Sequence, residues 1–206
     1  MPSLLRRRRE VDGQEREEHT DRVENVQGRT ARYGETIRIN HPVRAKFGKV
    51  EFMSIAPFVQ TPLEVAKKML DLSQVKPGEV LYDLGCGDGR LIILAAKDIG
   101  AKSTGIELRE DLVERARTEI KRFDLEDKVK VIQGNFFDVN ISDANVITLY
   151  LTSSANERLR PKLEAELKPG TRVVSHDFKV PGWKPVGVYD ELLGHTIYTY
   201  RIGEQL

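Results

Sequence analysis

The chain has 206 residues, of which 39% are hydrophobic and 32% are charged, and its formal net charge is +1. A chain of this length can bury one sizeable core, but it has no run near the roughly 18 consecutive apolar residues that a membrane-spanning helix needs. The single cysteine, Cys86, excludes an internal disulfide and a multi-cysteine metal site, and we expect no bound metal.

Residues 1–52 are a charged N-terminal extension that we expect to be disordered. Residues 1–35 contain one aromatic side chain and almost no clustered apolar positions, so they cannot bury enough surface to offset the entropy of ordering. We interpret the basic run Arg6 to Arg9 as a solvated charge run, with nucleic-acid contact as the weaker alternative. Because no apolar signal segment is found, we expect a cytoplasmic protein without membrane contact.

The composition changes at Met53, where we expect a packed domain that continues to residue 206. Thr61, Pro62 and Glu64 predict a helix start. Threonine would be the N-cap, proline the first helical residue, and glutamate the third residue of a capping box. Apolar residues then recur at helical spacing.

Strands and helices alternate after this first helix, which predicts βαβ units and a parallel sheet with helices on both faces. The last two β-rich runs lie close together around Gly194, which predicts a C-terminal antiparallel hairpin and brings the sheet to seven strands. The expected single strands cover residues 79–84, 103–107, 129–133, 145–151 and 171–178. The expected helices cover residues 89–99, 110–123 and 155–167.

A glycine-rich turn, YDLGCGDGR, joins the first of these strands to the helix after it. Gly85, Gly87 and Gly89 let a ligand approach the backbone, and the amides at the helix start favour an anionic group. Glu107 ends the second strand, 18 positions after Gly89, about where a ribose-binding carboxylate is expected. The pattern predicts a nucleotide-like cofactor.

The spacing of the turn distinguishes between cofactors. Dinucleotide-binding turns have G-x-G-x-x-G, but here the third glycine comes one residue early and Asp83 and Asp88 flank the turn. Two carboxylates would repel a pyrophosphate, whereas they suit a ligand with a positive centre, such as S-adenosylmethionine (SAM). The D-x-G-x-G-x-G turn with its downstream acid resembles the class I SAM-dependent methyltransferases, whose fold is a Rossmann-like seven-stranded sheet.

That resemblance implies roles for particular residues. Asp83 would lie near the methionine part, the first two glycines under the cofactor, and Glu107 on the ribose. In QGNFFDV, Asn135 would contact the adenine edge, with Phe136 beside the base. The expected cofactor contacts are Thr61, Asp83, Gly85, Gly87, Gly89, Glu107, Asn135 and Phe136.

Other reactive side chains have simpler interpretations. Cys86 is better explained as a small residue of the turn than as a nucleophile, because no histidine lies near it in sequence. His176 and His195 fall in predicted strands, where histidines are more often packed or solvated than catalytic. Trp183 is expected to cover the sheet edge rather than to stack on a base.

The connection before the terminal hairpin, KVPGWKPV, is too short for a helix or an inserted lid. A shallow, open site suits a flexible group on a large partner, such as a lysine side chain, better than a small molecule. No general base is evident, so we attribute most of the rate to holding amine and methyl in line. The candidate substrate-channel residues are Phe58, Thr61, Tyr150 and Thr152, and core-edge packing is the alternative for Phe58 and Tyr150.

Residues 53–203 resemble the small archaeal protein-lysine methyltransferases related to the non-SET histone lysine methyltransferase, through PFVQTP, YDLGCGDGR, GNFFDV, LYLTSSANERLRPKLEAELKPGTRVVSHDF and GW. One departure is Gln60, where the family pattern usually has proline. The resemblance implies methyl transfer from SAM to the ε-amine of protein lysines with broad tolerance, chromatin proteins among the acceptors. The alternatives are an RNA or small-molecule methyltransferase on the same fold and a non-catalytic SAM-binding subunit.

Overall fold

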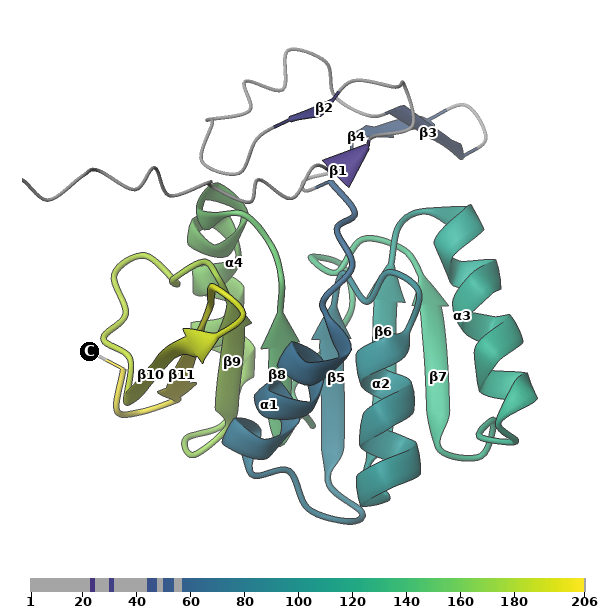
Figure 1. Cartoon of the computed structure of the whole chain (residues 1–206). Coiled ribbons are helices and arrows are strands. Elements are labelled where there is room, and N and C mark those ends of the chain that lie inside the picture. The colour runs from purple at the N-terminus through teal and green to yellow at the C-terminus, as the bar shows by residue number, and fades with distance from the viewer. Residues whose placement is uncertain (1–22, 25–29, 32–43, 48–49, 54–56, 206) are drawn as a thin grey trace, which may run out of the picture. The chain divides into compact units, whose positions relative to one another are not determined.

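The protein was analysed as a computed structural model (Figure 1), which describes residues 23–24, 30–31, 44–47, 50–53 and 57–205. The chain divides into two compact units, Met1–His41 and Pro42–Leu206. Most of the extension 1–52, including Arg6 to Arg9, lies outside the described residues, so its predicted disorder stays a prediction. Within it, β1 (Val23–Glu24) pairs with β2 (Thr30–Ala31), and β3 (Arg44–Phe47) pairs with β4 (Val50–Met53).

A seven-stranded sheet forms the centre of the larger unit, in the order β10-β11-β9-β8-β5-β6-β7 (Figure 1). Strands β9, β8, β5, β6 and β7 are parallel, whereas β11 is antiparallel to both β9 and β10. The predicted sheet and C-terminal hairpin are therefore confirmed. The strands are β5 (Val80–Leu84), β6 (Lys102–Glu107), β7 (Val129–Gln133), β8 (Val146–Leu149), β9 (Arg172–His176), β10 (Gly187–Leu192) and β11 (His195–Arg201).

Helices cover both faces of this sheet, and each face has its own hydrophobic cluster. One cluster joins Met69 of α1, Ile92 of α2 and Ile120 of α3. The other joins Leu159 and Leu163 of α4 to the opposite face. The helices are α1 (Leu63–Ser73), α2 (Arg90–Leu94), α3 (Glu110–Arg122) and α4 (Ser153–Glu166), and α2 continues into a wider π-helical turn at Ala95–Ile99.

The start of α1 differs from the prediction. Pro62, not Thr61, is the N-cap, and no side-chain cap hydrogen bond is made there. The carbonyl of Pro62 accepts the Ala66 N–H at 2.9 Å, which starts the helix at Leu63. The Thr61 carbonyl accepts a hydrogen bond from Arg90 instead. This second contact holds the residues before α1 against the glycine turn.

The carboxyl ends of the parallel strands meet at one edge of the sheet, where open α/β sheets bind ligands. The glycine turn follows β5, Glu107 ends β6, Tyr150 follows β8 and His176 ends β9. These strands therefore bring chain segments that are distant in sequence to a single rim. Among the described residues, no helix is both long and apolar enough to cross a membrane.

Candidate functional site

A cavity of about 120 Å³ lies at this edge of the sheet. Its walls come from the segment before α1, the glycine turn, the end of β6 and the loops after β7 and β8. Two predicted site residues, Gly89 and Thr152, do not line it. The predicted residues that do are Phe58, Thr61, Asp83, Gly85, Gly87, Glu107, Asn135, Phe136 and Tyr150.

Backbone amides fix the carboxylate of Glu107 on two sides. Its Oε2 accepts the Gly87 N–H at 3.0 Å, and its Oε1 accepts the Arg109 N–H at 2.8 Å. Each oxygen keeps a second lone pair that can accept a hydroxyl proton. An oriented carboxylate with two open acceptor positions fits the paired hydroxyls of a ribose, which is the role predicted for Glu107.

Asp83 is buried at the floor of the cavity and accepts a hydrogen bond from the Thr148 hydroxyl at 2.8 Å. Burial raises the pKa of Asp83 to about 7, and the negative charges of Glu107 and Asp88 add to the rise. A buried carboxylate beside other negative charges is stabilised by an approaching cation. Its surroundings therefore fit the ammonium and sulfonium charges of SAM.

The sequence analysis counted Asp88 as an unpaired negative charge of the turn, but in the structure its carboxylate is paired. Its carboxylate accepts from Arg90 Nε at 3.0 Å and from Arg90 Nη2 at 2.7 Å, and Gln60 Nε2 donates to it at 2.8 Å. Burial acts to raise the pKa of Asp88, but the hydrogen bonds and charge of Arg90 outweigh it, so this pKa lies below its ordinary value. The negative charge of the site therefore comes mainly from Asp83 and Glu107.

The sequence analysis missed Arg90, whose side chain joins two parts of the site. Besides pairing with Asp88, it donates from Nη1 to the Thr61 carbonyl at 2.6 Å. Gln60, which departs from the usual proline, makes its own hydrogen bond to Asp88. These bonds link the segment before α1 to the glycine turn. An arginine two residues after an aspartate at a helix start was the available signal.

The three glycines of the turn have different surroundings. All have positive φ angles, of 88° at Gly85, 55° at Gly87 and 79° at Gly89, a region that side-chain-bearing residues rarely adopt. A Cβ at Gly87 would lie 2.4 Å from the Phe58 ring, so this ring packs directly on the turn. A Cβ at Gly89 would lie 2.8 Å from Cβ of Ala116 in α3. Gly89 thus allows α3 to pack closely and does not face the cavity.

Asn135 and Phe136 lie in the loop after β7. Oδ1 of Asn135 accepts the Phe137 N–H at 3.1 Å, which fixes the amide and leaves its nitrogen as a donor. Phe136 is buried in the core cluster on the α4 face and packs tilted against Phe137, with ring centroids 4.9 Å apart. Phe136 therefore serves the core as well as the cavity wall.

Tyr150 forms the wall of the cavity that follows β8. Its ring stacks on His176 with centroids 3.8 Å apart and faces Phe178 at 6.4 Å. Thr152, predicted beside it in the channel, is instead the N-cap of α4, where its hydroxyl oxygen accepts the Ala155 N–H at 3.2 Å. Thr152 thus has a structural role at the start of α4, and it does not line the cavity.

Cys86 and Trp183 take structural positions. Burial raises the pKa of the Cys86 thiol well above its ordinary value, and the charges of Asp83 and Glu107 add to the rise, which disfavours the nucleophilic thiolate. Trp183 is buried, and its Nε1 donates to Glu164 at 2.7 Å. Neither side chain is arranged for chemistry or base stacking.

Comparison with known proteins agrees with this geometry. Residues 83–187 match the family described as the ANTKMT methyltransferase domain. The chain is 44% identical over 159 residues to "Protein-lysine N-methyltransferase" of the archaeon Saccharolobus islandicus, covering 75% of this chain and 99% of that protein. It is 35% identical to "Adenine nucleotide translocase lysine N-methyltransferase" of Mus musculus, where the match covers 70% of this chain and 63% of the mouse protein.

Among solved structures, a protein from Salinibacter ruber described as an RNA methyltransferase, in complex with S-adenosyl-L-homocysteine, is 47% identical. The TM-score is 0.69, and the match covers 72% of this chain and 96% of that one.

Proposed function

The chain belongs to the family of the ANTKMT methyltransferase domain, and from that premise we propose how its cavity serves methyl transfer. The protein is a SAM-dependent protein-lysine N-methyltransferase. The observation that carries this conclusion is the 44% identity to a protein-lysine N-methyltransferase across 99% of that protein's length. The buried carboxylate of Asp83 beside the glycine turn independently supports the use of SAM, because it suits a cationic nucleotide-like cofactor.

We propose that four groups hold the cofactor. Glu107 accepts the ribose hydroxyls, and Asp83 balances the positive charge of the methionine part. The Asn135 amide donates to the adenine edge, and Gly85 leaves the backbone open beneath the cofactor. Support for this assignment comes from the oriented carboxylate of Glu107 and the raised pKa of Asp83 described above.

Bound SAM supplies an electrophilic methyl group on a sulfonium. The chain's own task is then to bring an uncharged amine in line with that methyl and to exclude water. A lysine amine has an ordinary pKa of about 10.4, and a nearby positive charge together with partial desolvation lowers it. Tyr150 and Phe58 line the acceptor side of the cavity, where aromatic faces attract an approaching ammonium.

We further propose that the acceptor is a lysine on a folded protein. The connection between β9 and β10 contains no helix that could cover the cavity as a lid. Phe178, Val186 and Val188 are exposed in or next to this connection, and each offers an apolar side chain for contact with a protein partner. Chromatin proteins as acceptors remain a prediction that the same experiment tests, and a cytoplasmic setting remains a prediction.

The test incubates the purified protein with methyl-labelled SAM and a cell lysate from which small molecules have been removed. Parallel samples are treated afterwards with protease or with nuclease. We expect protease-sensitive label on lysine ε-amines, lost in Glu107→Ala and kept in the matched control Glu110→Ala. Fractionation of the lysate into soluble, chromatin and ribosomal pools identifies the acceptor class.

The contrary outcomes are equally specific. Label that is sensitive only to nuclease would make this chain an RNA methyltransferase, as the Salinibacter protein is described. No label in any fraction, even after the removed small molecules are added back, with measurable cofactor affinity, would support a non-catalytic SAM-binding subunit. Free lysine should accept far less label than protein, because it lacks the partner surface.

A further inference from the structure

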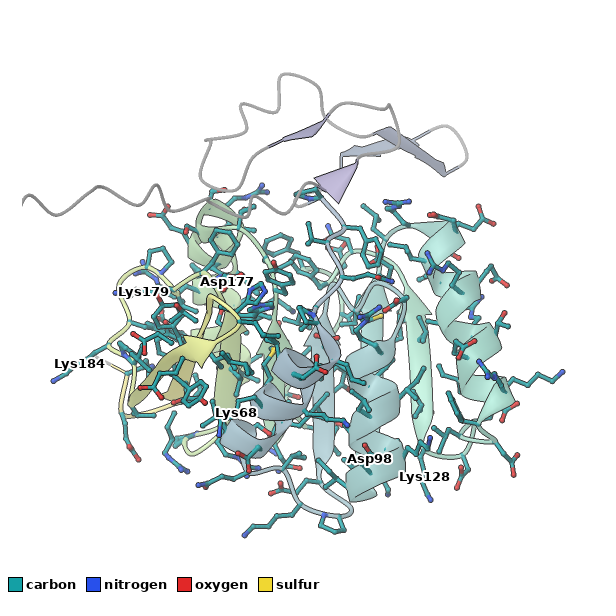
Figure 2. All side chains as sticks on the ribbon, viewed as in Figure 1. Lys68, Asp98, Lys128, Asp177, Lys179 and Lys184 are labelled. Carbon is teal, nitrogen blue, oxygen red and sulfur yellow. The ribbon has the colours of Figure 1, made fainter. Side chains whose placement is uncertain are left out.

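Three side chains with nitrogen or oxygen lone pairs converge next to Tyr150, outside the lining of the cofactor cavity. His176 ends β9, Asp177 follows it, and His195 begins β11. Nε2 of His176 lies 3.0 Å from Nδ1 of His195, which lies 2.9 Å from Oδ2 of Asp177. The third edge, from His176 Nε2 to Asp177 Oδ2, is 3.3 Å. Figure 2 labels Asp177 at this end of the sheet.

The backbone fixes the carboxylate of this triangle. Asp177 has a φ of 59°, and its N–H donates to the Thr196 carbonyl at 2.7 Å. Its Oδ1 accepts the Thr196 N–H at 3.0 Å, which leaves Oδ2 directed at the two rings. Register pairing of His176 with Ile197 brings the ends of β9 and β11 together. The three donors are therefore positioned by the sheet and not by chance surface contact.

Hydrogen bonds alone cannot occupy all three edges of this triangle. A ring nitrogen carries either one proton or one lone pair. If both rings donate to Oδ2, each proton has an acceptor, but the two N–H groups then face each other across 3.0 Å and the edge between them holds no hydrogen bond. If His195 donates to His176, the 2.9 Å contact to the carboxylate has no proton. In either arrangement one edge lacks its proton, whereas a shared cation is bound by all three atoms.

Burial of the His176 ring makes any polar atom without a partner costly. His176 is fully buried, and its Nδ1 has no hydrogen-bond partner among the described residues. Within the described part of the chain, the polar contacts of this ring therefore lie on the Nε2 side, toward His195 and Asp177. A bound group that contacts Nε2 therefore stabilises this buried ring strongly.

We propose that His176 Nε2, His195 Nδ1 and Asp177 Oδ2 form a binding site for a divalent transition metal of the zinc class. Zinc bonds of about 2.0–2.1 Å place tetrahedral ligand atoms about 3.3 Å apart, close to the three separations in this cluster. Two imidazoles and one carboxylate suit zinc, whereas magnesium and calcium prefer oxygen ligands. Three protein ligands leave a fourth position for water, on the partly exposed side of Asp177.

The site rests on its own residues and not on the proposed methyl transfer. None of its three ligands lines the cofactor cavity. Its link to that cavity is Tyr150, which stacks on His176 and lines the acceptor side. Metal at the triangle would hold the ring beneath Tyr150 in place.

The test measures metal binding directly. Tag-free protein is stripped with a chelator, saturated with S-adenosylhomocysteine to occupy the cofactor site, and equilibrated with Zn²⁺. Metal per chain is measured by mass spectrometry after gel filtration, and Co²⁺ serves as a spectroscopic probe of tetrahedral nitrogen and oxygen ligation. We expect one zinc per chain and a zinc-dependent rise in melting temperature.

Variants assign the metal to the triangle. His195→Gln and Asp177→Asn should each weaken zinc binding at least tenfold and abolish the rise in melting temperature. The chain has four histidines, so the double substitution His19→Ala/His41→Ala is the matched control and should keep one zinc. Circular dichroism and adenosylhomocysteine affinity check that the variants fold.

Two results would overturn the proposal. Wild-type protein that retains no zinc would leave a purely hydrogen-bonded cluster, and this measurement needs no variant to fold. Stoichiometric zinc that survives in His195→Gln but disappears in the double control would place the metal on the N-terminal histidines.

Discussion

Glu107 holds Gly87 across two neighbouring strands: its Oε2 accepts the Gly87 N–H at 3.0 Å. The residue predicted to bind the ribose therefore also shapes the glycine turn beneath the cofactor. One carboxylate links the two halves of the proposed cofactor site, so its removal should affect both binding and stability.

Substitution of Glu107 should separate these effects. Glu107→Ala leaves the Gly87 and Arg109 amides without their acceptor, at a cost of about 1–3 kcal/mol each if they remain buried. We expect SAM affinity to fall at least tenfold by calorimetry, with a lower free energy of unfolding in urea. Glu107→Gln keeps one acceptor oxygen and should lose less. Unchanged affinity in Glu107→Ala, matching the exposed control Glu110→Ala, would refute the ribose assignment.

Gly87 should be sensitive to a single added carbon. Gly87→Ala forces an L side chain into a positive φ, at roughly 1–2 kcal/mol, and drives its Cβ into the Phe58 ring. Gly78 has a φ of 80° and nothing within 4 Å of its Cβ position, so Gly78→Ala carries the backbone cost alone. We expect only Gly87→Ala to lose cofactor affinity, measured by calorimetry.

A double substitution isolates the steric part of this effect. Gly87→Ala/Phe58→Ala should be less destabilised than the sum of the two single variants, because the ring that meets the new Cβ is gone. Strict additivity of the unfolding free energies would show that Phe58 does not press on the turn.

The pKa of Asp83, raised to about 7, predicts a pH-dependent affinity. A cationic cofactor prefers the ionised carboxylate, which is the minor form at pH 6 and the major form at pH 8. SAM affinity should therefore rise about tenfold between these pH values, as measured by calorimetry. Asp83→Asn should bind more weakly and lose this dependence. A flat wild-type profile would contradict the raised pKa.

The same carboxyl group affects the stability of the cofactor-free protein. Its pKa is higher in the folded chain than in the unfolded chain, where it is near the ordinary 3.8. The folded state therefore binds more protons between about pH 4 and 7, and its contribution to stability is lost as pH rises through 7. Urea unfolding across this window should show that loss in wild type and not in Asp83→Asn.

Thr152 should matter for stability and not for binding. Thr152→Ala removes the acceptor of the Ala155 N–H, and the loss of such a cap costs about 1 kcal/mol. The KM for protein acceptor and the affinity for SAM should stay unchanged, and Thr152→Ser should restore stability. A large rise in KM with Thr152→Ala would return this residue to the substrate channel.

The sequence was most informative where local pattern and tertiary role coincide. The bounds predicted for the strand at 129–133 are those of β7, because its apolar run is short and flanked by polar residues. The glycine turn and Glu107 were identified together, since strand ends in a parallel sheet meet at one edge. Both inferences depended on periodicity and spacing, which the chain carries locally.

The remaining errors come from contacts between distant residues. Thr61 and Glu64 fit a capping box by their own chemistry, but Arg90 donates to the Thr61 carbonyl and the helix begins at Leu63. Gly89 resembled a cofactor contact until Ala116, from the next helix, defined its surroundings. No local pattern shows which side chain a later helix will bring to a glycine.

The polar bonds that join Gln60 and Thr61 to the glycine turn also concern the exchange of spent for fresh cofactor. With Phe58 packed on Gly87, the described cavity is smaller than the roughly 300 Å³ at which pockets for small molecules begin, so we expect this segment to move outward when the cofactor exchanges. Loosening it, as Arg90→Ala would, should hasten departure of adenosylhomocysteine. The rate of repeated catalytic cycles would then depend on how fast this segment opens, and not on the transfer step alone.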